Sequence, residues 1–177
     1  PASWRALASE APAGGMTAMG VHNLDAMIHL FGPIDEVYAR SLRRAIAYDA
    51  EDTTSVLFGF ANGMSGNLLS SLVTAVTYRL AVFGTKGCAE LLTPEFDFRF
   101  SPTPSAPPTG RQTAAEPELI QNRGSNTLRA ELEAFAAAIR GEAPYPIPPE
   151  EILHGVAAFE AIIRSAAERR PVKVPRD

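Results

Sequence analysis

Apolar residues recur at helical spacing near the start of the chain and again near its end. Leu24, Ile28 and Phe31 follow the i, i+4, i+7 pattern of an amphipathic helix, and Gly32 is a typical residue for ending it. The pattern predicts a helix over about residues 21–31. Two further stripes predict two helices toward the C-terminus: Leu128, Leu132, Phe135 and Ile139, then Ile152, Val156, Phe159 and Ile163.

The middle of the chain has a β-type pattern instead. Runs of apolar and β-branched residues are separated by short turns, Asn62-Gly63 and Gly84-Thr85-Lys86-Gly87. Turns this short leave no room for a crossover helix, so the strands they join must be antiparallel. Because Val56–Phe60 and Leu80–Phe83 are apolar at nearly every position, we expect helices on one face of the sheet and a partner surface on the other. The expected strands cover residues 37–42, 53–61, 64–73, 77–84, 88–93 and 96–101, with a short edge strand at 172–174.

These elements predict one α+β domain over residues 1–177, built on an open, mainly antiparallel sheet of about six strands. Ser125 or Asn126 is the expected N-cap of the first C-terminal helix. The predicted segments are an extended lead-in (1–13), a candidate site loop and helix (14–32), a β-meander (35–101), a loop or lid rich in Pro, Thr, Ala and Ser (102–124), and two helices with an edge strand (125–174).

Composition and charge limit the classes of partner. The 177 residues are 46% hydrophobic and 20% charged, which is typical of a globular protein. A net charge of −4 with scattered basic residues argues against nucleic acid, and no apolar run is long enough to span a membrane. Cys88 is the single cysteine, so no internal disulfide forms, and a reducing, cytoplasmic location is expected. The chain begins at Pro1 without a methionine, which suggests a piece of a longer protein.

The candidate chemistry lies in the passage Gly14 to Asp25, which combines three glycines, a histidine and an aspartate. An imidazole beside the positive end of a helix dipole is favoured in its neutral form, which can accept a proton from a substrate hydroxyl. His22 is therefore a candidate base, and the alternative is a structural histidine bonded to a loop carbonyl. Asp25 is three residues further on, hence on the same helical face, and could orient the imidazole, bind substrate or only offset the helix dipole.

Metal and phosphate sites are not predicted. His22 and His29 are separated by roughly 10.5 Å along a helix, whereas zinc needs ligand nitrogens within about 2.1 Å of one ion. The glycines of residues 14–20 lack the following Lys-Ser/Thr of a P-loop. No Gly-x-Gly-x-x-Gly opens a helix after a strand, so no Rossmann domain is expected in this chain.

The passage Ala13-Gly14-Gly15-Met16-Thr17-Ala18-Met19-Gly20-Val21-His22-Asn23-Leu24-Asp25, which runs on to Leu30-Phe31-Gly32, resembles the C-terminal domain of the Gfo/Idh/MocA oxidoreductases. That family commonly reads Gly-Gly-x-x-x-Asp-x-Gly-x-His-x-x-Asp at this place. The resemblance continues over nearly the whole chain, through residues 52–56, 60–66, 83–87 and 165–174.

The resemblance implies an NAD(P)-dependent dehydrogenase acting on a polyol, a sugar or a cyclic hydroxy-acid. NAD or NADP would be bound mainly by an N-terminal Rossmann domain outside this sequence, and the fragment alone would be inactive. His22 matches the family's catalytic histidine, and Asp25, Arg79 and Lys86 are candidates for substrate binding. The open sheet face would form a homodimer or tetramer.

One position departs from the family pattern. The catalytic aspartate of the family precedes the histidine by four residues, and here that position is Ala18. The sequence therefore leaves two alternatives open: a non-catalytic sensor or binding protein on the same fold, and a structural domain that serves only to dimerise.

Overall fold

The computed structural model describes residues 4–92, 96–104, 116–122, 124 and 126–176. These residues form two compact units, Pro1–Thr74 with Pro144–Asp177, and Ala75–Ala143. All strand pairs in the described ranges are antiparallel, so the predicted α+β class is confirmed. In the same ranges, no helix combines the length and apolar character needed to cross a membrane.

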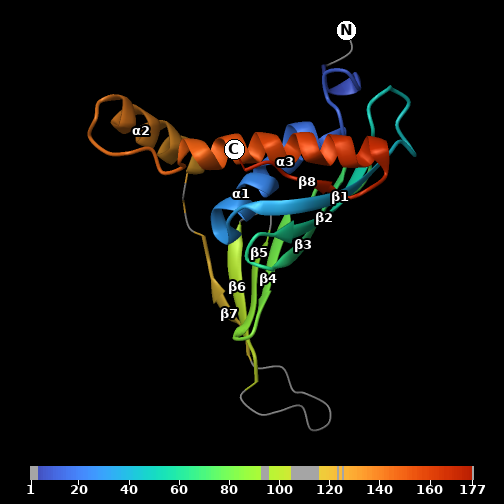
Figure 1. The fold of residues 1–177 in the computed structure, drawn as a ribbon. Coiled ribbons are helices and arrows are strands. Elements are labelled where there is room, and N and C mark those ends of the chain that lie inside the picture. Colours follow the sequence, from blue (N-terminus) through green and yellow to red (C-terminus); the bar gives the residue numbers. More distant parts are fainter. Residues whose placement is uncertain (1–3, 93–95, 105–115, 123, 125, 177) are drawn as a thin grey trace. The chain divides into compact units, whose positions relative to one another are not determined.

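The first unit is a four-stranded sheet with two helices on one face (Figure 1). Its strands lie in the order β3-β2-β1-β8, and β8 is the predicted edge strand. The inner face buries alternate residues of β2 such as Val56 and Phe58, whereas Leu57 between them in the sequence lies on the opposite, outer face. The elements are η1 (Trp4–Ala6), η2 (Met16–Gly20), α1 (Val21–Phe31), β1 (Ile34–Leu42), β2 (Thr53–Phe60), β3 (Ser65–Ser71), α3 (Pro149–Glu168) and β8 (Val172–Lys173).

Small residues let α3 approach the sheet closely. Ala158, Ala161, Ile162 and Ser165 are its buried residues, whereas Ile152 and Val156 of the predicted stripe are about half exposed, at 47% and 55%. The predicted face of this helix was therefore wrong along its first half. On α1, the terminal methyl group of Met27 packs closely against Gly66 of β3, where a β-carbon would come within 3.0 Å of it.

The loop between β1 and β2 is organised by one buried carboxylate. Asp52 accepts the backbone N–H groups of Arg44 and Ala45 at 2.7 Å each, and that of Ile46 at 3.3 Å. These bonds, from Ala45 first, lower the pKa of Asp52 from 3.8 to about 2. A single carboxylate thereby binds three backbone N–H groups and holds the ten-residue loop in place.

The second unit holds the remaining strands, in the order β4-β5-β6-β7, and one helix. The predicted sheet of about six strands is thus divided between two sheets, because residues 72–78 form bends and coil between β3 and β4. The strand β7 interrupts the segment predicted as a loop or lid, most of which lies outside the described residues. The elements are β4 (Arg79–Gly84), β5 (Gly87–Leu92), β6 (Asp97–Pro102), β7 (Glu118–Ile120) and α2 (Thr127–Ile139).

The helix α2 begins as predicted at Asn126, whose side chain accepts the N–H of Arg129 at 3.0 Å. The other N-cap candidate, Ser125, lies outside the described residues. The apolar stripe of α2 is exposed rather than buried, from 55% at Phe135 to 71% at Ile139.

Candidate functional site

A tight turn at Ala13 and Gly14 directly precedes the candidate site. Ala13 and Gly14 both have positive φ angles, 60° and 55°. A β-carbon at Gly14 would overlap the carbonyl oxygen of Glu51, so only glycine allows this approach of the two loops. The turn is also held by Thr54, whose hydroxyl donates to the carbonyl of Ala13 at 3.0 Å.

The segment after this turn, η2, is a π-helix that runs directly into α1. Its wide turns suit Gly20, where a side chain would collide with Met16. The predicted limits of α1 are confirmed, but the expectation that His22 lies at a free helix end is wrong. Helical backbone begins six residues earlier, at Met16, so the unpaired N–H groups of the helix start lie well before His22. Such π-segments occur frequently at functional sites.

His22 and Asp25 line one hollow in the first unit. Its volume is ≈ 290 Å³ and it lies between α1 and α3. His22 is exposed and Asp25 is half-buried, so a molecule entering the hollow could reach both side chains. The remaining lining residues are mostly apolar: Val21, Leu24, Ile152, Gly155, Val156 and Phe159. The hollow thus offers one imidazole and one carboxylate on an apolar wall.

Asn23, next to His22, was not singled out from the sequence. Its side-chain oxygen is buried and has no hydrogen-bond partner among the described residues, and the same holds for one carboxylate oxygen of Glu51. Neither residue belongs to a recognisable motif, because an orphaned polar atom is a property of the packed structure.

The other two predicted binding residues, Arg79 and Lys86, lie in the second unit. Arg79 is not a free cation, since it forms an ion pair with the buried carboxylate of Glu90. Arg99 binds the second oxygen of that carboxylate, and hydrogen bonds from Arg99 and then Arg79 hold the pKa of Glu90 below its usual value, against burial. Lys86 is exposed in the tight turn between β4 and β5.

The other two histidines have structural partners. His29 bonds Glu151 of α3 at 3.0 Å. His154 is half-buried, and its Nε2 accepts the N–H of Ile34 at 2.9 Å. Burial lowers the pKa of His154, against a hydrogen bond with the backbone of Pro175. Within the described ranges, no three His, Cys, Asp or Glu side chains gather closely enough to hold a metal ion.

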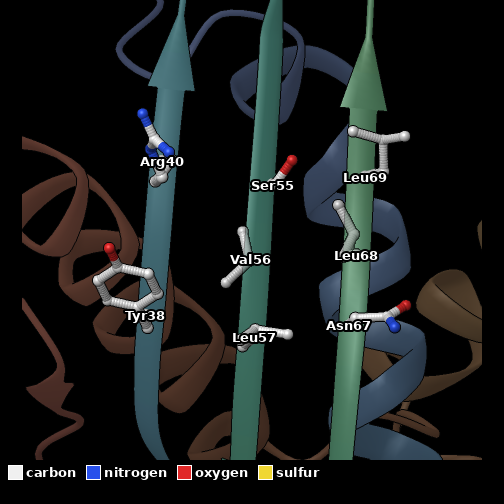
Figure 2. Close-up of a pocket in the computed structure, with 8 residues that line it drawn as sticks. All are labelled: Tyr38, Arg40, Ser55, Val56, Leu57, Asn67, Leu68 and Leu69. Carbon is white, nitrogen blue, oxygen red and sulfur yellow. The ribbon is translucent and has the colours of Figure 1, made fainter. Parts of the chain in front are cut away.

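The outer face of the sheet β3-β2-β1-β8 forms a second hollow, of ≈ 390 Å³ (Figure 2). Tyr38 of β1 lies beside Leu57 of β2, Arg40 of β1 lies beside Ser55, and Asn67 and Leu69 of β3 complete the surface. Leu57 and Leu69 are 58% and 69% exposed. The predicted apolar character of both sheet faces is therefore seen on β2, where Phe58 is buried on the inner face and Leu57 is exposed on the outer face.

The first unit is an open-faced α+β domain. Its antiparallel sheet has helices on one face, and one of these helices, α1, carries the exposed His22. The chain belongs to the GFO/IDH/MocA family, because residues 1–90 match the model of the GFO/IDH/MocA C-terminal domain. The resemblance predicted from the sequence is thereby confirmed.

Known relatives agree with this assignment. An uncharacterized oxidoreductase of Rhizobium meliloti, ORF334, is 28% identical over 160 residues, covering 86% of this chain and 46% of the relative. A candidate NADPH-dependent oxidoreductase from Desulfitobacterium hafniense has a similar structure, with a TM-score of 0.83 and 22% identity over 97% of this chain and 51% of that one. Levoglucosan dehydrogenase in complex with NADH follows at 0.82 and 19%, covering 100% and 54%. The chain thus spans about half the length of these relatives.

Proposed function

We propose that this chain is the substrate-binding and oligomerisation domain of an NAD(P)-dependent dehydrogenase acting on a polyol, a sugar or a cyclic hydroxy-acid. The observation that carries the proposal is the position of His22: it matches the histidine of the sequence pattern that resembles the family, and it lines a hollow together with the carboxylate of Asp25. An exposed imidazole on a mostly apolar wall is suited to take a proton from a bound hydroxyl.

The named neighbours support the substrate class. Levoglucosan dehydrogenase was solved with NADH and L-sorbose, and the WlbA dehydrogenase of Bordetella pertussis with NADH and UDP-GlcNAcA. Both are dehydrogenases with sugar-type ligands on the same fold. They favour a hydroxyl-bearing substrate over an amine or an acyl group.

In the proposed reaction, His22 accepts the proton of the substrate hydroxyl as the carbinol carbon is oxidised. Asp25 lies one helical turn away in the same hollow, where it stabilises the imidazolium or holds a second hydroxyl. The nicotinamide, when bound, supplies the acceptor for the hydride. We place the cofactor on a companion domain, because the chain spans about half the length of its relatives and its described strands are all antiparallel, whereas dinucleotide-binding domains use a mostly parallel sheet.

The test is turnover by the full-length protein with His22→Ala, measured as NAD(P)H formation across a panel of sugars and polyols. Loss of a general base lowers kcat by about 10²–10⁴-fold. His29→Ala is the matched control, because His29 is an exposed histidine on the same helix whose partner is Glu151. Wild-type turnover by His22→Ala would disprove the assignment.

One observation favours a second function. Ala18 cannot supply the acid that the family pattern places four residues before the histidine. A non-catalytic sensor or binding protein would then show no cofactor reduction with any substrate of the panel, yet would still bind a sugar.

Calorimetry on the 177-residue chain tests the domain assignment separately: micromolar binding of NAD(P) to it would contradict a cofactor site on a companion domain.

We also propose that the outer face of the sheet mediates a homodimer or tetramer. Leu57 and Leu69 are exposed there on adjacent strands, over a hollow of ≈ 390 Å³. Exposed apolar patches of this kind mark interaction surfaces. Size-exclusion chromatography with light scattering tests the proposal, and a chain that remains monomeric at all concentrations would refute it.

A further inference from the structure

The outer face carries charge in a symmetric arrangement. Cross-strand register places Tyr38, Leu57 and Asn67 in one row, and Arg40, Ser55 and Leu69 in the next (Figure 2). Glu36 lies on β1 at the same distance from Tyr38 as Arg40, in the opposite direction. The two residues are therefore about 13 Å apart along the strand, from roughly 3.3 Å per residue, with the tyrosine midway between them.

Arg40 has no ion-pair or hydrogen-bond partner among the described residues, and it is exposed. Glu36 has a distant contact only, with Lys173 of β8 at 3.7 Å, and its side chain is 45% exposed. An unpaired guanidinium on a face that also carries the exposed side chains of Leu57 and Leu69 is unfavourable in any dry interface unless the partner supplies an anion. The charge of Arg40 therefore restricts how a partner can cover this face.

A second copy can cover the face in two aligned ways, because packed sheets keep their strands within about 30° of each other. A two-fold axis parallel to the strands lays β1 over β3, which sets Arg40 on Leu69 of the second copy and leaves the charge buried without a partner. An axis across the strands lays β1 over β1 in the opposite direction. If that axis passes at Arg40, the arginines of the two copies face each other. If it passes at Tyr38, Arg40 of one copy faces Glu36 of the other.

We propose that two copies pair through this face about a two-fold axis at Tyr38, with Arg40 of each copy bound to Glu36 of the other. The inference rests on the proposed self-association and specifies its register. Two reciprocal ion pairs flank an apolar and aromatic centre in which Tyr38 meets Tyr38 and Leu57 meets Leu57. Sheets packed about 10 Å apart leave room for an arginine and a glutamate to meet end to end.

The test uses charge reversal in the full chain, with mass measured by sedimentation velocity. Arg40→Glu and Glu36→Arg each create two like-charge contacts per dimer and should raise the dimer Kd on the order of 100-fold. Mixing the two variants restores opposite charges at both contacts, so the mixture should form a heterodimer near wild-type affinity. The double variant E36R/R40E should likewise recover. Circular dichroism and thermal unfolding confirm that each single variant is folded.

Other outcomes overturn the proposal in distinguishable ways. Leu57→Asp tests the face itself: if it dissociates the dimer while Arg40→Glu does not, the face is an interface but the register is wrong. If neither variant changes the mass, the copies associate elsewhere. A wild-type chain that is monomeric means that another partner covers the face, which also overturns the pairing. None of these results depends on NAD(P)H formation, so they leave the proposed catalytic role separately testable.

Discussion

Replacing Ser165 by alanine should destabilise the protein more than any ordinary surface substitution. Ser165 is fully buried, and its hydroxyl oxygen accepts the N–H of Ala39 at 2.9 Å and donates to the carbonyl of Arg170 at 2.6 Å. β8 pairs with β1 only at Glu36 and Val37, so the sheet offers Ala39 no neighbour on that side. The helix α3 thus supplies the acceptor that the short edge strand lacks.

The expected cost follows from the two groups left unpaired. A buried backbone group without a partner costs about 1–3 kcal/mol, and water can reach the carbonyl of Arg170 at the end of α3 more easily than the amide of Ala39. Alanine returns about 0.5 kcal/mol through its higher helix propensity. The net loss is about 2–3 kcal/mol, which lowers Tm by roughly 4–12 °C for a chain of this size.

Urea unfolding followed by circular dichroism measures the free energy, and hydrogen exchange reports the amide of Ala39 directly. Ser65→Ala is the control, because Ser65 is exposed at the start of β3. The variant S165A should show faster exchange at Ala39 while Ser65→Ala matches the wild type. A free energy of unfolding within about 0.5 kcal/mol of wild type would refute the reasoning.

Two pH effects follow from the buried groups. Because the native pKa of Asp52 is about 2, below its ordinary 3.8, its contribution to stability is complete above pH 3.8 and is lost as the pH falls toward 2. In urea titrations the variant Asp52→Asn should lack this acid-dependent loss. If the free energy of unfolding of the variant falls with pH as steeply as that of the wild type, the prediction is contradicted. Burial lowers the pKa of His154, so its contribution is complete above 6.5 and declines as the pH falls below that value. The variant His154→Gln should keep an acceptor for the N–H of Ile34, and its Tm should change little between about pH 7 and 5. If the Tm of the variant still falls with pH in this range, another group is responsible.

Much of the fold could be predicted because its signals are local. Asn62-Gly63 between two β-type runs predicted the β2–β3 hairpin, and Gly32 marked the end of α1. The identity of the family followed from the order of several such passages. These features depend on residues close together in the chain, where spacing and turn chemistry decide the backbone.

The remaining features depend on tertiary contacts. The buried face of α3 is formed by Ala158, Ala161 and Ser165, small residues whose value lies in close approach to β1 rather than in hydrophobicity. Three residues of β7 have no strand pattern of their own and extend because β6 pairs with them. The orphaned oxygen of Asn23 exists only once its surroundings are packed.

The π-helical segment Met16–Gly20 decides which way the catalytic candidate faces. An α-helix turns by about 100° per residue, so each residue between the glycine turn and α1 sets the rotational phase of His22. Shortening the segment by one residue would turn the imidazole away from its hollow although His22 itself is unchanged. The direction in which His22 points is therefore set by the number of residues that precede it, so an insertion or a deletion there would redirect the imidazole even if every side chain of the site were kept.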